Sequence, residues 1–120
     1  MIQHALPVML DFVNEGKLSI ATLVEKMSHN PAIVYNIKDR GFIREGYYAD
    51  LTLVDLNDPW VVAQDNIYYK CGWSPLEGNT LKSRVLRTWV NGSLVFNGGN
   101  WSTVIKSKPL VKDLRIDQNA

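Results

Sequence analysis

The segment that most constrains the fold of this chain is residues 41–56, GFIREGYYADLTLVDL, because it separates two halves with different patterns. Gly46 is a turn residue that takes positive φ at no steric cost, and the β-favouring run Leu51-Thr52-Leu53-Val54 follows Asp50. The segment therefore predicts strand, tight turn and strand, with Phe42-Ile43 opening the first extended piece. Helical patterns precede it and strand and turn patterns follow it, so the sequence predicts an α+β fold.

The first helix is predicted from apolar residues that recur at helical spacing. Pro7 is tolerated only in the first turn of a helix, which places the start near residues 4–6. Gly16 is a suitable residue for the carboxy-terminal stop. The apolar face at spacings of i, i+3, i+4 and i+7 consists of Leu6, Met9, Leu10 and Val13.

A second and a third helix are predicted before residue 41. Ser19 is suited to cap the second helix, and Pro31 biases the preceding residue away from helical geometry, so this helix should end near Ser28 or His29. Asn30 then caps a third short helix with Pro31 at its first position. Three helices this short make a thin core by themselves, so their apolar faces need a partner surface.

Short strands and turns are predicted after residue 56. Residues 60–62 form a short strand, and Asp65 caps a short helical turn that runs to Tyr69. Residues 71–80, CGWSPLEGNT, contain two glycines, a proline and several turn formers. This composition predicts an ordered loop rather than a helix or strand.

The strongest local signal in the second half is an Asn-Gly pair. Asn91-Gly92 separates the β-favouring runs 85–90 and 93–96, a pattern typical of a β-hairpin. A glycine-rich turn after residue 96 ends this hairpin. Val104-Ile105 is a candidate for a further strand, and the rest of the tail at 99–120 has mixed polarity and gives no clear prediction.

Composition excludes several classes of protein. The chain has 120 residues, of which 46% are hydrophobic and 21% charged, as expected for a folded domain, and its net charge of +1 favours neither nucleic acid nor membrane as a partner. Pro7, Asp11 and Glu15 interrupt what would be the apolar core of a signal peptide. The single cysteine, Cys71, excludes an internal disulfide framework and fits a reducing compartment, so we expect a cytoplasmic protein.

The candidate residues for chemistry are few and scattered. His4 and His29 are 25 positions apart and match neither H-x-H nor H-E-x-x-H, so each is better explained as a helix-end or surface histidine. Cys71 is better explained as an unreactive cysteine than as a reactive thiol. Asp55 and Asp58 flank a strand end, where turn capping explains them more simply than a catalytic pair.

Glu77 is the last candidate, and as a lone carboxylate it is better explained as an acceptor that fixes its loop. The sequence also lacks the glycine-rich phosphate-binding motifs and any C-x-x-C pair. No residue of the chain is therefore predicted to be catalytic, to bind a cofactor or to bind a metal.

Four stretches of the sequence form a recognisable set: ALPVML at 5–10, LVEKMSHNPAIVYN at 23–36, a G-x-I-x-x-G-x-x-A-D-L signature at 41–55, and Lys70 with SPLEG at 74–78. Together they resemble the carboxy-terminal end of dihydroorotases, which are cyclic amidohydrolases. The signature is shared by many amidohydrolases, and the S-P-L-E-G loop narrows the resemblance to dihydroorotase or allantoinase.

The resemblance implies a specific parent protein. Dihydroorotases are (β/α)₈ barrels with one or two zinc ions that open the ring of dihydroorotate reversibly to N-carbamoyl-aspartate, a step of pyrimidine biosynthesis. Their ligands are an H-x-H, a carboxylated lysine, two further histidines and an aspartate of the eighth strand. All of these precede the part that this chain resembles, so the resemblance implies zinc for the parent enzyme and none in this chain, which alone is expected to be inactive.

The resemblance also divides the chain and implies its partners. Residues 1–40 correspond to the last barrel helices, residues 41–98 to the carboxy-terminal part of a composite β-sandwich, including the 70–80 loop, and residues 99–120 to a tail. The expected partners are the rest of the barrel and the amino-terminal sandwich strands. Their absence would leave an apolar face uncovered, around Val54, Val61, Val62, Val85 and Val95, so we expect the isolated chain to self-associate, which light scattering would detect.

Two alternatives remain open from the sequence. The parent could be another cyclic amidohydrolase, an allantoinase or a hydantoinase, although a hydantoinase usually lacks the proline of the S-P-L-E-G loop. The chain could instead be a self-contained, non-catalytic α+β interaction module that reuses the signature without its chemistry. Such a module needs a complete hydrophobic core.

Overall fold

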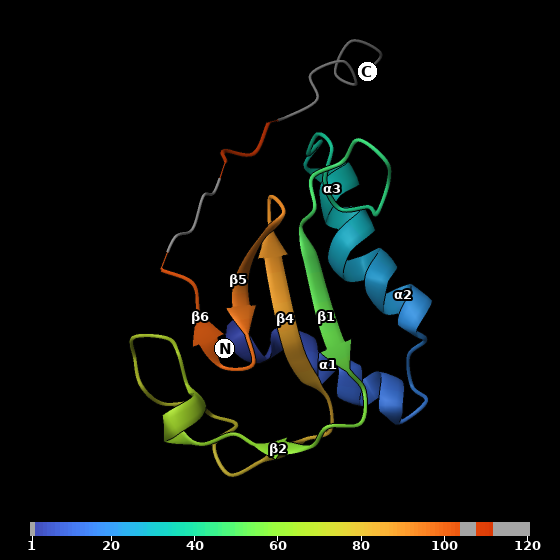
Figure 1. Cartoon of the computed structure of the whole chain (residues 1–120). Coiled ribbons are helices and arrows are strands. Elements are labelled where there is room, and N and C mark those ends of the chain that lie inside the picture. Colours follow the sequence, from blue (N-terminus) through green and yellow to red (C-terminus); the bar gives the residue numbers. More distant parts are fainter. Residues whose placement is uncertain (1, 104–107, 112–120) are drawn as a thin grey trace.

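The computed structural model describes residues 2–103 and 108–111, so the strand expected at Val104-Ile105 lies outside the described residues. Helices form the first third of the chain, and antiparallel strands and loops follow (Figure 1). The α+β composition expected from the sequence is therefore present.

The first helix is α1 (Ala5–Asn14), preceded by the 3-10 turn η1 (Ile2–His4). Gly16 has a φ of +71° and donates its N–H to the Val13 carbonyl oxygen at 3.0 Å. Glycine adopts this left-handed geometry without a steric cost, and the predicted stop at Gly16 is confirmed.

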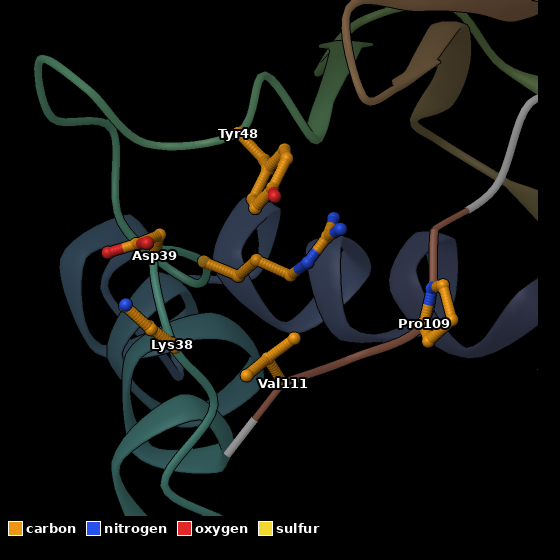
Figure 2. Close-up of a pocket in the computed structure, with 6 residues that line it drawn as sticks. Lys38, Asp39, Tyr48, Pro109 and Val111 are labelled. Carbon is orange, nitrogen blue, oxygen red and sulfur yellow. The ribbon is translucent and has the colours of Figure 1, made fainter. Parts of the chain in front are cut away.

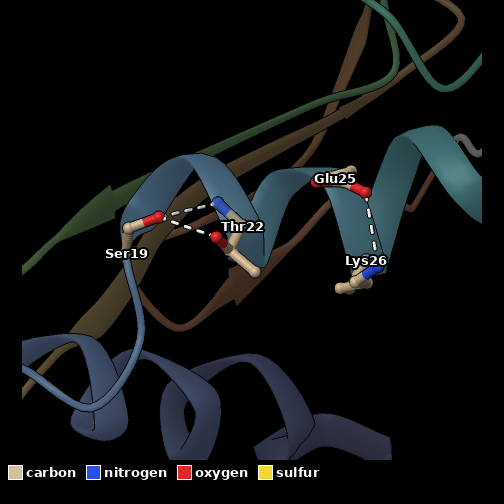
Figure 3. Close-up of polar contacts among 4 residues, drawn as sticks. All are labelled: Ser19, Thr22, Glu25 and Lys26. Carbon is tan, nitrogen blue, oxygen red and sulfur yellow. Dashed lines mark hydrogen bonds and ion pairs between the residues drawn. The ribbon is translucent and has the colours of Figure 1, made fainter.

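The second helix, α2 (Ile20–Val24), begins with the predicted cap. Ser19 Oγ accepts a hydrogen bond from the Thr22 N–H at 3.0 Å and shares another with the Thr22 hydroxyl at 2.8 Å (Figure 3). The next turn carries an exposed pair of neighbours, Glu25 and Lys26, at 3.3 Å. The cap satisfies an amide that the first helical turn would otherwise leave unpaired.

The helix does not end before Pro31, so the predicted break there and the predicted Asn30 cap were wrong. α2 continues through a π-helical turn, η2 (Glu25–His29), into α3 (Asn30–Val34), and Asn30 itself is helical with φ −62° and ψ −42°. Its N–H reaches the Glu25 carbonyl five residues earlier. This wider turn makes room for a proline ring that would clash in a regular α-helix. In the part of the chain that the structure describes, no helix is both long and apolar enough to cross a membrane.

The segment after α3 is an irregular loop, so the strand predicted at Phe42-Ile43 was also wrong. The Phe42 ring stacks on His29 with the ring centroids 4.2 Å apart, and the Arg44 guanidinium lies 4.2 Å from the Phe42 centroid. Gly41 packs directly against Ala32 of α3. Packing on the helices, rather than strand pairing, therefore fixes the path of this segment.

Four antiparallel strands form the main sheet in the order β1-β4-β5-β6. The central pair, β4 and β5, is joined by Asn91 and Gly92, whose φ values of +49° and +78° are those that a two-residue turn requires. β1 lies at one edge and pairs only with β4 among the described residues. The bounds are Leu51–Asp55 for β1, Arg84–Val90 for β4, Ser93–Asn97 for β5 and Asn100–Trp101 for β6.

A second, two-stranded sheet consists of β2 (Trp60–Val61) and β3 (Thr80–Leu81). The helical turn between them is η3 (Gln64–Asn66), and the predicted Asp65 cap was wrong. The Asn66 Oδ1 instead accepts the Ala63 N–H at 3.0 Å, so the turn is closed from its carboxy-terminal side and does not extend to Tyr69.

The helices lie against one side of this arrangement, with α1 crossing behind the lower ends of the strands and α2 and α3 running beside β1 (Figure 1). Few side chains are buried between these layers. The buried hydrophobic residues of the described chain are Leu10, Leu23, Ala32, Val62, Leu81 and Val95. This core is thin for the amount of apolar surface present, as the short helices predicted.

Part of the apolar face that the sequence predicted to be uncovered is exposed in the structure. Val61 is 49% exposed and Val54 and Val85 are half-buried, but Val62 and Val95 are buried, so those two were wrongly included. The 71–80 loop lies against Val62, whose N–H donates to the Asn79 carbonyl oxygen and whose carbonyl oxygen accepts the Gly78 N–H. The largest exposed apolar side chains lie elsewhere and include Val34, Tyr35, Leu53, Trp73 and Trp101.

The close approach of Gly41 to α3 can be tested with two glycines that have nearly the same φ. A Cβ at Gly41 would lie 2.3 Å from Ala32 Cβ and 2.8 Å from the Ser28 carbonyl oxygen, whereas a Cβ at Gly46 meets nothing within 4 Å. The two φ values, +81° and +82°, impose the same strain on alanine. We expect Gly46→Ala to cost about 1 kcal/mol and Gly41→Ala about 3 kcal/mol of unfolding free energy in urea titrations, and equal losses would contradict the packing.

Candidate functional site

A groove with a volume of about 1300 Å³ lies between α1 and the main sheet. One wall comes from the start of the chain, with Ile2, Leu6 and Pro7, and the other from the sheet. Trp60, Tyr68, Tyr69 and Cys71 also line the groove. The lining is mainly apolar and aromatic, and its one charged side chain is Arg84.

Part of the sheet wall of the groove is a row of paired residues that crosses all four strands. Thr52 of β1 is opposite Thr88 of β4, Thr88 is opposite Phe96 of β5, and Phe96 is opposite Trp101 of β6. The Phe96 and Trp101 ring centroids are 5.0 Å apart, and Tyr68 makes an edge contact with each of them at 6.1 and 5.4 Å. Side chains that are paired across strands on one face of a sheet stabilise one another, so the positions of these side chains are fixed by their neighbours.

A buried polar cluster lies directly behind the groove wall. His4 is fully buried, and its ring centroid is 5.9 Å from that of Trp60 and 5.9 Å from that of Tyr69. Among the described residues, neither ring nitrogen of His4 nor the Tyr69 hydroxyl has a hydrogen-bond partner. Burial lowers the pKa of His4 below its ordinary value of 6.5, because the charged ring would lose its hydration.

The structure separates the other candidates that the sequence singled out. His29 stacks on Phe42 at the far end of the helical half, and Cys71 is exposed with its Sγ 3.7 Å from the Trp73 carbonyl oxygen. Glu77 is an exposed loop residue whose N–H donates to the Ser74 carbonyl oxygen. These groups do not converge on one point.

The two aspartates near β1 have structural contacts. Asp55 Oδ1 accepts the Asn57 N–H at 2.8 Å, which is the turn capping that the sequence predicted. Asp58 forms an ion pair with Arg84 at 2.7 Å. Within residues 2–103 and 108–111, no group of three His, Cys, Asp or Glu side chains is placed to hold a metal ion.

The sequence did not reveal the best-formed polar cluster, which joins Arg40, Asp50 and Asn91. Arg40 is 8% exposed, its Nη1 pairs with the Asp50 carboxylate, and its Nη2 donates to Asn91 Oδ1 at 2.8 Å. Asp50 Oδ1 in turn accepts the Asn91 N–H at 2.8 Å. The Arg40 guanidinium also lies 4.1 Å from the Tyr48 ring centroid. The sequence did draw attention to Asp50, through the Ala-Asp pair of the signature, but nothing in the sequence indicated that Arg40 is its partner.

A small pocket of about 120 Å³ opens beside this cluster. Figure 2 shows Tyr48 above the pocket and Pro109 and Val111 on its far side, with Lys38 and Asp39 at the helix end. The Lys38 N–H donates to the Val111 carbonyl oxygen at 2.8 Å. The pocket is therefore formed where the tail crosses the loop after α3, and it is too small for a substrate.

Comparison with known proteins identifies the family. The pattern of the amidohydrolase family matches residues 1–95. The chain belongs to the amidohydrolase family. This amidohydrolase chain is 38% identical over 94 residues to the dihydroorotase of Pyrococcus furiosus, a match that covers 78% of the chain and 22% of that protein. The chain thus spans about a fifth of the length of the curated relatives it matches.

Solved structures of amidohydrolases resemble the chain in the same way. The L-hydantoinase of Arthrobacter aurescens matches with a TM-score of 0.74 and 31% identity, over 82% of this chain and 22% of that one. The inactive dihydroorotase-like domain of the Chaetomium thermophilum CAD-like multifunctional protein matches with a TM-score of 0.66 and 21% identity, over 83% and 26%. The second likeness shows a shared fold.

The Arg40 cluster predicts a large difference between two aspartate substitutions. Asp50→Asn leaves a buried guanidinium without its countercharge, so we expect a loss of about 3 kcal/mol of unfolding free energy. Asp58→Asn removes a more exposed pair with Arg84 and should cost at most about 1 kcal/mol. Urea titration of both variants measures the difference, and a loss at position 50 no larger than at position 58 would contradict the role given to the cluster.

The buried His4 predicts a pH-dependent stability. The unfolded chain binds a proton at this residue near pH 6.5 and the folded chain only at lower pH, so the contribution is complete above pH 6.5 and is lost as the pH falls below it. We expect the unfolding free energy of the original chain relative to His4→Phe to fall between pH 8 and 5.5, by at most about 1.4 kcal/mol per pH unit. A difference that stays constant with pH would contradict the burial of a neutral ring.

Proposed function

We propose that this chain is the carboxy-terminal part of a dihydroorotase-like amidohydrolase and serves there as a structural piece. The single observation that supports this most is the 38% identity to a dihydroorotase over 94 residues, combined with coverage of 22% of that protein. The longer protein would hydrolyse a cyclic amide, dihydroorotate, reversibly to N-carbamoyl-aspartate.

Zinc belongs to the part of this longer protein that precedes the chain. A catalytic zinc ion needs three protein ligands as well as an open position for water. The chain has two histidines, one buried against Trp60 and Tyr69 and one stacked on Phe42, so they cannot share an ion. The residues described here do not fit the metal, and no catalytic, cofactor-binding or metal-binding role is assigned to any of them.

The division of the chain follows from the same proposal. Residues 1–40 would supply the last helices of the barrel, and residues 41–98 the carboxy-terminal strands of a composite β-sandwich. Two observations support this: β1 lies at the edge of the sheet, and its Leu51 and Leu53 side chains are 37% and 45% exposed in a strand of strong β-formers. Amino-terminal strands of the longer protein would pair with that edge. In the isolated chain the same edge would promote self-association.

Two other functions remain as alternatives to dihydroorotase activity. The likeness to an L-hydantoinase at 31% identity supports a longer protein that acts on another cyclic amide. A non-catalytic α+β interaction module is less well supported, because the described residues bury few apolar side chains and leave many exposed.

Assays of two proteins test the proposal. The 120-residue chain and the longer protein encoded with the sequence preceding residue 1 should each be supplied with zinc and given dihydroorotate, allantoin and hydantoin. We expect hydrolysis of dihydroorotate by the longer protein and none by the 120-residue chain. Turnover by the short chain alone would overturn the structural role, and a preference of the longer protein for hydantoin or allantoin would replace dihydroorotase activity with one of the alternatives.

A further inference from the structure

The tail segment at 108–111 lies outside the part of the chain that the family pattern matches, which ends at residue 95. It nevertheless contacts the helical half, because Pro109 and Val111 line the small pocket beside Arg40 (Figure 2). β6, the last strand of the described chain, and α3 lie at opposite ends of the sheet (Figure 1). The segment therefore makes its contacts far from the place where β6 ends.

Two contacts attach this segment, one at each of its ends. The Lys38 N–H donates to the Val111 carbonyl oxygen at 2.8 Å, and Lys108 Nζ lies 5.4 Å from the Tyr48 ring centroid. An ammonium group within about 6 Å of an aromatic ring is attracted to it. Lys38 comes shortly after α3 and Tyr48 shortly before β1, so the segment bridges the two limbs of the loop that joins the helical half to the sheet.

The same two limbs are joined to one another beneath the segment. The Tyr48 N–H donates to the Asp39 carbonyl oxygen at 3.0 Å, and the Arg40 guanidinium lies 4.1 Å from the Tyr48 ring centroid. Arg40 is 8% exposed and pairs with Asp50. The Tyr48 ring thus has one cation from the buried cluster and one from the tail beside it, so its position links the tail to the cluster.

The attachment of the tail segment depends little on apolar burial. Its two aliphatic side chains, Leu110 and Val111, are 62% and 58% exposed. A segment that buries few apolar atoms and is fixed by two polar contacts opens at a small cost, without unfolding of the elements to which it is attached. This segment can therefore detach while the helices and the sheet remain folded.

We propose that residues 108–111 are a strap that closes reversibly over Tyr48 and the Arg40–Asp50 pair. The closed strap holds the two limbs of the loop together and limits the access of water to the Arg40 guanidinium. Opening of the strap would expose this guanidinium and loosen the join between the helical half and the sheet. The strap requires neither the longer protein nor its activity, so the hydrolysis assay does not test it.

The Lys38 amide provides a direct readout, because the strap supplies its hydrogen-bond acceptor. Hydrogen–deuterium exchange should be followed by NMR in the 120-residue chain and in the chain truncated after residue 103. We expect the truncation to accelerate exchange at Lys38 about tenfold or more, because its amide loses its acceptor. The reference is the Val62 amide, which is bonded to the Asn79 carbonyl oxygen at 2.9 Å and should change little.

Substitutions at Lys108 test the strap in a chain of unchanged length. Lys108→Met keeps an unbranched side chain but removes the charge beside Tyr48, so we expect exchange at Lys38 to rise about threefold. Lys108→Arg keeps a cation there and should retain the original rate. As a matched control, Lys70→Met removes the charge of an exposed lysine in the β half and should leave the Lys38 rate unchanged.

Unchanged exchange at Lys38 after truncation would overturn the strap. If the truncated chain does not fold, the Lys108 variants decide, and equal Lys38 rates for Lys108→Met and Lys108→Arg would overturn it. A rise at Val62 as large as at Lys38 in Lys108→Met would also do so, because the tail would then stabilise the whole chain rather than close over one loop.

Discussion

The buried guanidinium of Arg40 is the constraint on which the arrangement of this chain depends. It comes directly after the helical half, its carboxylate partner Asp50 directly precedes β1, and its amide partner Asn91 forms the turn between β4 and β5. The Gly92 N–H also donates to the Ala49 carbonyl oxygen at 3.0 Å, beside the same site. Because a buried charge is costly without its partners, the three segments are held in one relative position. The Ala-Asp pair of the family signature thereby has a structural role in joining these segments.

The Arg40 cluster matters for the stability of the described chain because few hydrophobic side chains are buried in it. Leu10 and Leu23 are buried in the helices and Val95 in the sheet, but β1 is exposed along nearly its whole length. A strand of leucine, threonine and valine gains stability from being covered on a face, and this one is covered little by the described residues. The sequence is therefore suited to a larger core than these residues provide. For the same reason, the exposed apolar side chains indicate contacts with a partner more directly than the exposed polar side chains do.

Features of the fold that depend on neighbours in sequence were predictable, and features that depend on distant packing were not. Ser19 caps α2 and Gly16 ends α1 because each acts within one turn of its own position. The break expected at Asn30 failed because a π turn accommodates Pro31, and the strand expected at Phe42 failed because that ring stacks on His29. The Arg40 cluster spans up to 51 positions, and a single sequence contains no signal for such a pairing. His4 was expected at a helix end or on the surface; it directly precedes α1 but is completely buried, because Trp60 and Tyr69 from the other half pack against it.

The buried polar cluster and the groove lie on the two sides of one wall, and this shared position has a consequence for the molecule. Tyr69 contacts His4 on one side and lines the groove on the other, so the packing of the groove and the environment of His4 are coupled through one ring. Burying unpartnered polar atoms is unfavourable, so this region of the described chain is locally less stable than its apolar surroundings suggest. The protonation of His4 therefore depends on how Trp60 and Tyr69, which come from the other half of the chain, pack around its ring.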